Sequence, residues 1–221
     1  MKTIAITLGD PAGIGPEIAL KAIQSLTTAP DAAHTRLLLI GDAGTLAAAG
    51  SKLGLPVPPV IRADDLDTAP SAAILPTSRP AELIETGRVS AEGGRQAFEA
   101  VRMAVDLALS GRIGAMVTAP LNKEALHLGG HHYPGHTEML ADLTGVRDSV
   151  MMLAHQNFRV SHVTTHCALE DVPKKATAAR IRRVVDLTHA ALVALGINDP
   201  RIAIAALNPH AGEGGIFGRH D

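Results

Sequence analysis

The chain has 221 residues, of which 46% are hydrophobic and only 2% aromatic, and its formal net charge is −2. A core of Ala, Leu, Ile and Val is therefore expected, and no global charge favours binding to nucleic acid or to an anionic membrane. The single cysteine, Cys167, excludes an internal disulfide framework and is typical of a reducing compartment. No signal peptide or membrane span of roughly 20 apolar residues is recognisable, so a cytoplasmic protein is expected.

Short apolar runs alternate with longer helical patterns along the chain. In chain order, the pattern predicts a strand at 3–8, a helix at 16–26, a strand at 36–40, a helix at 90–109, strands at 113–118 and 158–164, a helix at 177–195 and a strand at 202–207. Residues 56–88 contain several prolines and are expected to be connecting structure. This order predicts an α/β fold with a mostly parallel sheet covered by helices. Because residues 208–221 form a Gly-rich polar loop after the last strand, the chain is expected to be truncated at its C-terminus.

Two histidines directly follow predicted strands. His166 comes after the strand at 158–164, and His210 comes after the strand at 202–207. Ligands of open parallel sheets bind beyond the carboxyl ends of the strands, and imidazoles in that position suit Zn²⁺ or a similar ion, although a third ligand must come from elsewhere. The alternative is that each histidine is a loop residue bonded to backbone, and 11 histidines in the chain make chance placement easy. The spacing leaves both interpretations open.

The Gly-rich loop at residues 9–17 precedes the first predicted helix. Backbone N–H groups at a helix N-terminus can hold an anion. However, the order G-x-x-x-G-x-G differs from the dinucleotide-binding fingerprint, and no Walker lysine follows. A tight strand-to-helix turn, which Asp10 and Glu17 cap or orient, is therefore an equally good interpretation.

A third polar segment surrounds His136 and Thr137, directly before a predicted helix. Thr137 is a candidate N-cap of that helix. Alternatively, the two side chains bind an anionic substrate together. Lys123 is interpreted as a solvated helix residue rather than an anion contact.

Five motifs resemble those of the 4-hydroxythreonine-4-phosphate dehydrogenases and occur in that family's order. They are TLGDPAGIGPEI at 7–18, TAPLNK at 118–123, YPGHTE at 133–138, Thr165-His166 with Val172-Pro173, and NPHAGE at 208–213. The resemblance implies a fold like those of isocitrate and isopropylmalate dehydrogenases, with two α/β/α domains and a mostly parallel sheet. It implies a first domain at residues 1–125, an incomplete second domain at 126–221, and a homodimer with active sites at the subunit interface.

The chemistry of the site also follows from this resemblance. Enzymes of the family oxidise a phosphorylated β-hydroxy acid with NAD (or NADP), and the resulting β-keto acid loses CO₂. The resemblance implies that His166 and His210 bind a divalent metal, with Zn²⁺ expected and Mg²⁺, Co²⁺ or Mn²⁺ as alternatives, and that His136 and Thr137 contact the substrate. The third metal histidine and much of the NAD site belong to a later motif that this chain lacks, so no cofactor-binding residue is assigned.

The family contains branches with different substrates. The first expectation is 4-hydroxythreonine 4-phosphate, in pyridoxal phosphate (vitamin B6) biosynthesis. The run at 122–133 especially resembles a paralogous branch that acts on 4-phospho-D-threonate or 4-phospho-D-erythronate. Terephthalate dihydrodiol dehydrogenases are similar but lack the Gly-His-Thr-Glu found at 135–138. Two further alternatives remain: a phosphate acyltransferase, which needs neither metal nor NAD, and an inactive truncated fragment.

Overall fold

The computed structural model describes residues 2–28, 34–80, 84–146 and 148–220. The contacts within the chain divide it into two compact units, Met1–Arg147 and Asp148–Asp221. The domain boundary expected after residue 125 lies inside helix α4 (Lys123–Leu128). The contacts of this chain place the division further along, because α4 and α5 (His136–Thr144) pack against α3 (Ala91–Leu109) of the first unit.

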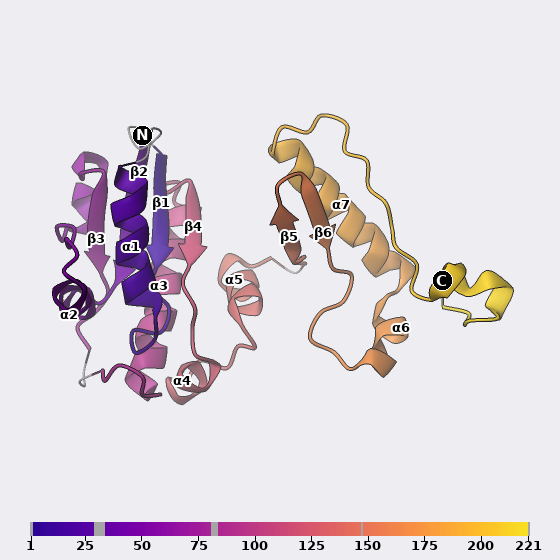
Figure 1. Ribbon diagram of the computed structural model, residues 1–221, viewed down its shortest axis with the longest axis horizontal. Helices are drawn as coiled ribbons and strands as arrows, with labels where there is room; N and C mark the ends of the chain where they lie inside the picture. Colours follow the sequence, from indigo (N-terminus) through magenta and orange to yellow (C-terminus); the bar gives the residue numbers. More distant parts are fainter. Residues whose placement is uncertain (1, 29–33, 81–83, 147, 221) are drawn as a thin grey trace. The chain divides into compact units, whose positions relative to one another are not determined.

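The described part of the first unit is built on a four-stranded parallel sheet in the order β3-β2-β1-β4 (Figure 1). Its strands are β1 (Lys2–Thr7), β2 (Thr35–Gly41), β3 (Ala72–Pro76) and β4 (Ala115–Thr118). The central strand β2 reads Leu37-Leu38-Leu39-Ile40, with no alternation of polar residues. Such a run is typical of a strand that is covered on both faces.

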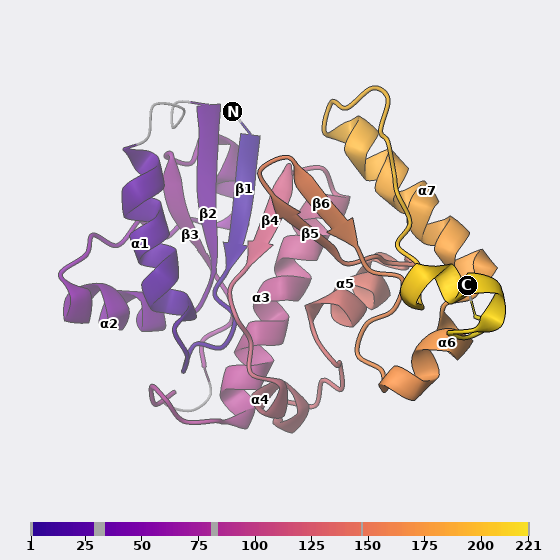
Figure 2. The same cartoon turned by 45° about the vertical axis from the view of Figure 1, so that its right-hand side comes forward.

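The two faces of the sheet have separate cores. Leu38 and Ile40 pack with the small residues Ala100 and Ala104 of α3 on one face. Leu37 and Leu39 lie in the core with residues of α1 (Gly15–Thr27) and α2 (Ala43–Leu53) on the other face. Figure 2 shows α1 and α3 on opposite sides of the strands. This layering confirms the predicted class of a parallel sheet covered by helices.

Helices α4 and α5 extend the first unit beyond the sheet. Leu126 of α4 and Met139 of α5 are buried against Val101 and Val105 of α3. At the crossing of α3 and α4, a Cβ added to Gly94 would lie 1.8 Å from the carbonyl oxygen of Ala125. The backbone of α4 therefore lies directly against α3, and only glycine fits at that position.

The second unit contains an antiparallel hairpin of β5 (Met152–His155) and β6 (Phe158–Ser161), followed by α6 (Val172–Lys175) and α7 (Ala178–Ala194). The Thr188 hydroxyl of α7 donates a hydrogen bond to Ser161 Oγ at 2.8 Å. Arg180 of α7 donates to the carbonyl of Val163 at 3.0 Å. These bonds join the long helix to the end of the hairpin and to the loop that follows it. None of the helices in the described residues is long and apolar enough to cross a membrane.

Most of the predicted elements are confirmed. The helices at 16–26, 90–109 and 177–195 correspond to α1, α3 and α7, and the strands at 3–8, 36–40 and 113–118 correspond to β1, β2 and β4. Ser90 and Thr177 cap α3 and α7 through their side chains. Gly196 has a φ of +88°, as expected for a left-handed residue after a helix.

Three local predictions are wrong. Residues 202–207 form no strand in the described structure, because no neighbouring strand pairs with their backbone. The strand predicted at 158–164 is shorter, and its partner β5 is antiparallel. The stretch at 56–88 contains β3 and the short helix η2 (Ala63–Thr68). Its prolines interrupt the apolar pattern, so the sequence alone predicts connecting structure where a short buried strand lies.

Candidate functional site

The glycine loop after β1 is a tight turn at the carboxyl edge of the sheet. Gly9 has a φ of +64°, and a Cβ added there would lie 2.1 Å from the carbonyl oxygen of Pro120. A Cβ on Gly15 would lie 1.8 Å from the carbonyl oxygen of Leu8. Both glycines are therefore required by the close approach of backbone segments. The geometry supports the interpretation of this loop as a strand-to-helix turn.

Asp10 orients this turn. Its side chain is only 7% exposed, and its Oδ1 accepts a hydrogen bond from the backbone N–H of Ala12 at 2.9 Å. Burial raises the pKa of the Asp10 carboxyl, and the bond from Ala12 opposes that rise. Glu17 instead forms an ion pair with Lys21 at 2.5 Å on the surface of α1, and this pairing lowers its pKa. Of the two acids, Asp10 is thus the one that shapes the turn.

A polar network that the sequence interpretation missed follows β3 at the same edge of the sheet. The Thr77 hydroxyl donates to Gln96 Oε1 at 2.6 Å. Ser78 donates to Glu99 through both its backbone N–H, at 2.8 Å, and its hydroxyl, at 2.6 Å. Arg95 donates to Ser78 Oγ and to Glu99 Oε2, each at 3.0 Å. The sequence signal for this network is Thr77-Ser78, which directly follows an apolar run. The signal is recognisable only when that run is predicted to be a strand.

His136 and Thr137 form the first turn of α5. The residue at the N-cap position is Gly135, with a φ of 176°, and no side chain in the described residues caps this helix. The prediction that Thr137 caps the helix is therefore wrong, because the extended backbone ends at Gly135 and the helix begins one residue before Thr137. The free backbone N–H groups of this turn can bind an anion.

The His136 ring adds a neutral hydrogen-bonding group to that turn. Its Nε2 atom is buried and has no hydrogen-bond partner among the described residues. Burial also lowers the pKa of the ring, so the imidazole is neutral at pH 7. A buried ring nitrogen without a partner is costly unless a ligand satisfies it. His136, Thr137 and the start of α5 together can therefore hold a small polar or anionic ligand.

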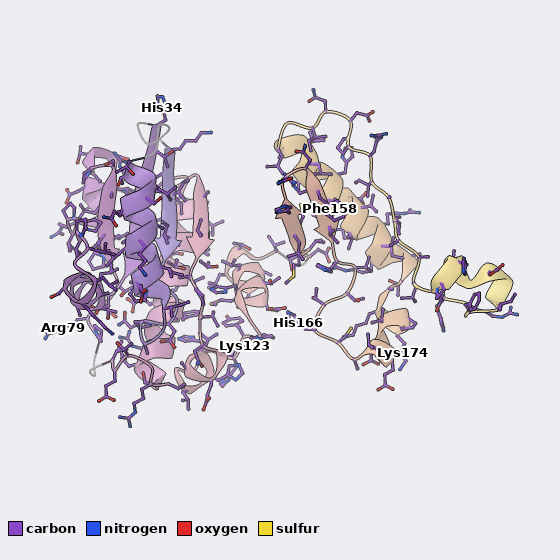
Figure 3. All side chains as sticks on the ribbon, viewed as in Figure 1. His34, Arg79, Lys123, Phe158, His166 and Lys174 are labelled. Atoms are coloured by element: carbon purple, nitrogen blue, oxygen red, sulfur yellow. The ribbon has the colours of Figure 1, made fainter. Side chains whose placement is uncertain are left out.

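His166 and His210 do not directly follow strands, contrary to the prediction. His166 lies in the loop after β6, and His210 lies in the segment η4 (Pro209–Gly215), in which residues 210–214 have left-handed rather than helical backbone angles. Both are exposed, and each has a φ of +53° (Figure 3 labels His166). In the ranges that the structure describes, no group of three His, Cys, Asp or Glu side chains could surround a metal ion. Their role as metal ligands stays a prediction. Lys123, also labelled, is exposed at the start of α4.

Comparison with known proteins identifies the family. The family described as "Pyridoxal phosphate biosynthetic protein PdxA" matches residues 33–221. The chain belongs to the PdxA family. A protein of Bradyrhizobium diazoefficiens, provisionally named D-threonate 4-phosphate dehydrogenase, is 56% identical to this PdxA-family chain over 219 residues. The match covers 99% of the chain but only 63% of that relative.

Two other relatives agree with this assignment. The D-threonate 4-phosphate dehydrogenase of Salmonella typhimurium is 44% identical, with 98% of the chain and 67% of the relative covered. The crystal structure of a 4-hydroxythreonine-4-phosphate dehydrogenase from Burkholderia phymatum matches with a TM-score of 0.81 at 44% identity, and the match covers 99% of this chain and 66% of that one. The resemblance of the motifs and the fold class of the PdxA family are thereby confirmed.

The folded PdxA-family chain is expected to lose stability as the pH falls below about 6.5. Burial lowers the pKa of both His131 and His136, and nearby His132 and Arg95 add to the effect at His131. A depressed histidine pKa means that the unfolded state binds protons more readily. The stabilisation is therefore complete above the ordinary pKa of about 6.5 and is lost as the pH falls below it through the folded-state values.

The midpoint of urea unfolding, followed through Tyr133 fluorescence, measures this loss. Tyr133 is the only tyrosine and the chain has no tryptophan, so the signal reports on the first unit. A double variant, His131→Asn with His136→Gln, is expected to show a flatter pH dependence. An equally steep dependence in that variant would contradict the assignment to these two histidines.

Proposed function

We propose that the whole protein oxidises a small phosphorylated hydroxy acid with NAD or NADP as the hydride acceptor, and that the keto acid product then loses CO₂. Family membership and the dehydrogenase names of the relatives support this reaction. The observation on this chain that carries the proposal is the buried Nε2 of His136 at the start of α5, since neither this atom nor the helix start has a side-chain partner among the described residues. The proposal includes a cytoplasmic homodimer with shared active sites.

The first turn of α5 has a defined role in this proposal. Its free N–H groups and the Thr137 hydroxyl bind an anionic group of the substrate, because the N-terminus of a helix carries partial positive charge. The His136 ring, held neutral by burial, exchanges one hydrogen bond with the substrate without adding a charge. These residues bind and orient the substrate, while NAD supplies the redox chemistry when bound.

We also propose that His166 and His210 bind a divalent ion, with Zn²⁺ expected. Imidazole nitrogens are the donors that Zn²⁺ prefers, and a bound ion would supply charge stabilisation at a substrate oxygen. The residues present do not complete such a site, because no three His, Cys, Asp or Glu side chains in the described ranges could surround an ion. No step of the reaction is therefore assigned to the metal.

For the substrate, we propose 4-hydroxythreonine 4-phosphate or D-threonate 4-phosphate. The 56% identity to a relative named for D-threonate 4-phosphate favours the second compound. Both compounds carry a phosphate and a carboxylate on a short hydroxylated chain, so both offer an anionic group to the start of α5. The two are separated by comparing kcat/KM in one assay.

The test is NADH formation by the purified whole protein, and by this chain alone, with each of these compounds. His136→Ala is expected to lower kcat/KM about 100-fold, because a ligand-binding group in a buried position is lost. The matched control is His34→Ala, which replaces an exposed histidine at the amino end of β2 and is expected to leave the rate unchanged. Absence of turnover by the whole protein with both compounds would contradict the proposal and favour the acyltransferase, whereas absence of turnover by this chain alone would favour the inactive fragment.

A further inference from the structure

The segment at residues 129–135 joins α4 to α5 and delivers His136. Pro134 restricts its backbone at one position, but Gly129 and Gly130 begin the segment and Gly135 directly precedes His136. Gly130 has a φ of +89°. No side chain among the described residues caps α5 at the end of this segment. Glycine imposes few conformational limits, so other contacts must hold His136 in place.

Aromatic stacking against α3 supplies the first of those contacts. The His131 ring stacks on Phe98 with 3.6 Å between ring centroids and an interplanar angle of 12°. The Tyr133 ring is nearly parallel to Phe98, at 6.2 Å and 7°. Tyr133 also packs with buried Leu126 and Met139 in the core between α3, α4 and α5. One ring on the rigid helix α3 thus aligns two rings of the segment.

Hydrogen bonds then join the same segment to both neighbouring helices. The Tyr133 hydroxyl donates to Asp142 Oδ2 of α5 at 2.6 Å, and this bond raises the pKa of Tyr133. The Tyr133 carbonyl lies 3.3 Å from Nε2 of His127 on α4. The backbone N–H of His131 donates to the carbonyl of Leu126 at 3.0 Å. Tyr133 is therefore the residue of the segment with contacts to all three helices.

We infer that Tyr133 is a positioning residue, which fixes the first turn of α5 and so the direction of the His136 ring and the Thr137 hydroxyl. Its ring sets the distance of the segment from α3, and its hydroxyl holds α5 through Asp142. A hydrogen bond to a charged carboxylate is stronger than one between neutral groups, so it holds the orientation well. The importance of this placement for the substrate rests on the proposed function.

The test is a titration of the His136 imidazole by NMR in the full chain. Tyr133→Leu removes both the ring and the hydroxyl, and is expected to raise the pKa of His136 toward its ordinary value as its burial is lost. Tyr133→Phe keeps the ring and is expected to produce a smaller rise. The control is Thr144→Val, which removes the hydrogen bond from Thr144 Oγ1 to the Leu140 carbonyl within α5 and is expected to leave the His136 pKa unchanged.

An unchanged His136 pKa in Tyr133→Leu, with helicity by circular dichroism intact, would overturn the inference. Should that variant unfold, Tyr133→Phe decides the question, since it retains the packing of the ring. The titration needs neither substrate nor NAD, so its outcome is independent of the proposed reaction. A raised His136 pKa in Tyr133→Leu would support the positioning role of Tyr133 whatever the effect of His136→Ala on NADH formation. Unchanged NADH formation in His136→Ala would reject only the substrate role of His136.

Discussion

Gly94→Ala is expected to destabilise the first unit by about 2–3 kcal/mol, even though alanine is the better helix former. The propensity gain of about 1 kcal/mol is outweighed because the new Cβ would lie 1.8 Å from the Ala125 carbonyl oxygen and 2.2 Å from its carbon. Both are backbone atoms of α4, which cannot rotate away as a side chain can. Either α4 moves or α3 bends. Urea unfolding followed by Tyr133 fluorescence measures the change.

Gly44→Ala is the matched control, since it adds the same methyl group to helix α2. Its Cβ would meet only the Asp42 carboxylate, at 3.2 Å, which caps α2 by accepting hydrogen bonds from Thr45 and has to shift only slightly, so a smaller loss, within about 1 kcal/mol, is expected. Because α4 leads into the segment that carries His136, Gly94→Ala is also expected to shift the His136 imidazole signal, and Gly44→Ala is not. Equal stability of the two variants would show that α4 does not need its close contact with α3.

The sequence predicts the first unit well because the local signals there agree with the tertiary structure. The uninterrupted apolar run of β2 indicates a strand that is covered on both faces. Pro16 indicates the residue at which α1 begins. The predictions fail where an element depends on distant partners. Residues 202–207 are apolar enough for a strand, but a strand is stable only when a neighbour pairs with its backbone, and none does so in the described structure.

The candidate site is predictable in part for the same reason. A histidine and a threonine before a helix indicate a polar helix start, and the structure places both in the first turn of α5. The stacking of His131 and Tyr133 on Phe98 was not predicted, because Phe98 lies on α3, far away in the sequence. The helical periodicity of apolar residues identifies the buried face of α3. It does not identify which rings from another segment pack against Phe98.

Replacing His166 and His210 together by alanine is expected to reduce the affinity of the chain for Zn²⁺ at least about tenfold, close to 1.4 kcal/mol. Each histidine supplies one imidazole donor, and loss of both removes every ligand proposed for the ion. The two residues share an unusual backbone: each has a φ of +53°, in the left-handed region that non-glycine residues rarely adopt. The same conformation occurs at Gln156, Ala211 and Glu213, so the backbone alone does not distinguish the two histidines. Zn²⁺ titration with measurement of bound metal per subunit gives the affinity.

The control must separate a defined site from adventitious binding to surface histidines. His155 and His189 lie in the same unit and are also exposed, so the double variant His155→Ala, His189→Ala removes two imidazoles of similar accessibility. Retention of Zn²⁺ by this variant and loss by the His166, His210 variant would support a specific pair of ligands. Equal loss in both would identify the binding as nonspecific. If the parent chain itself binds no Zn²⁺, the pair needs a ligand from outside these 221 residues, and the prediction for this chain is wrong.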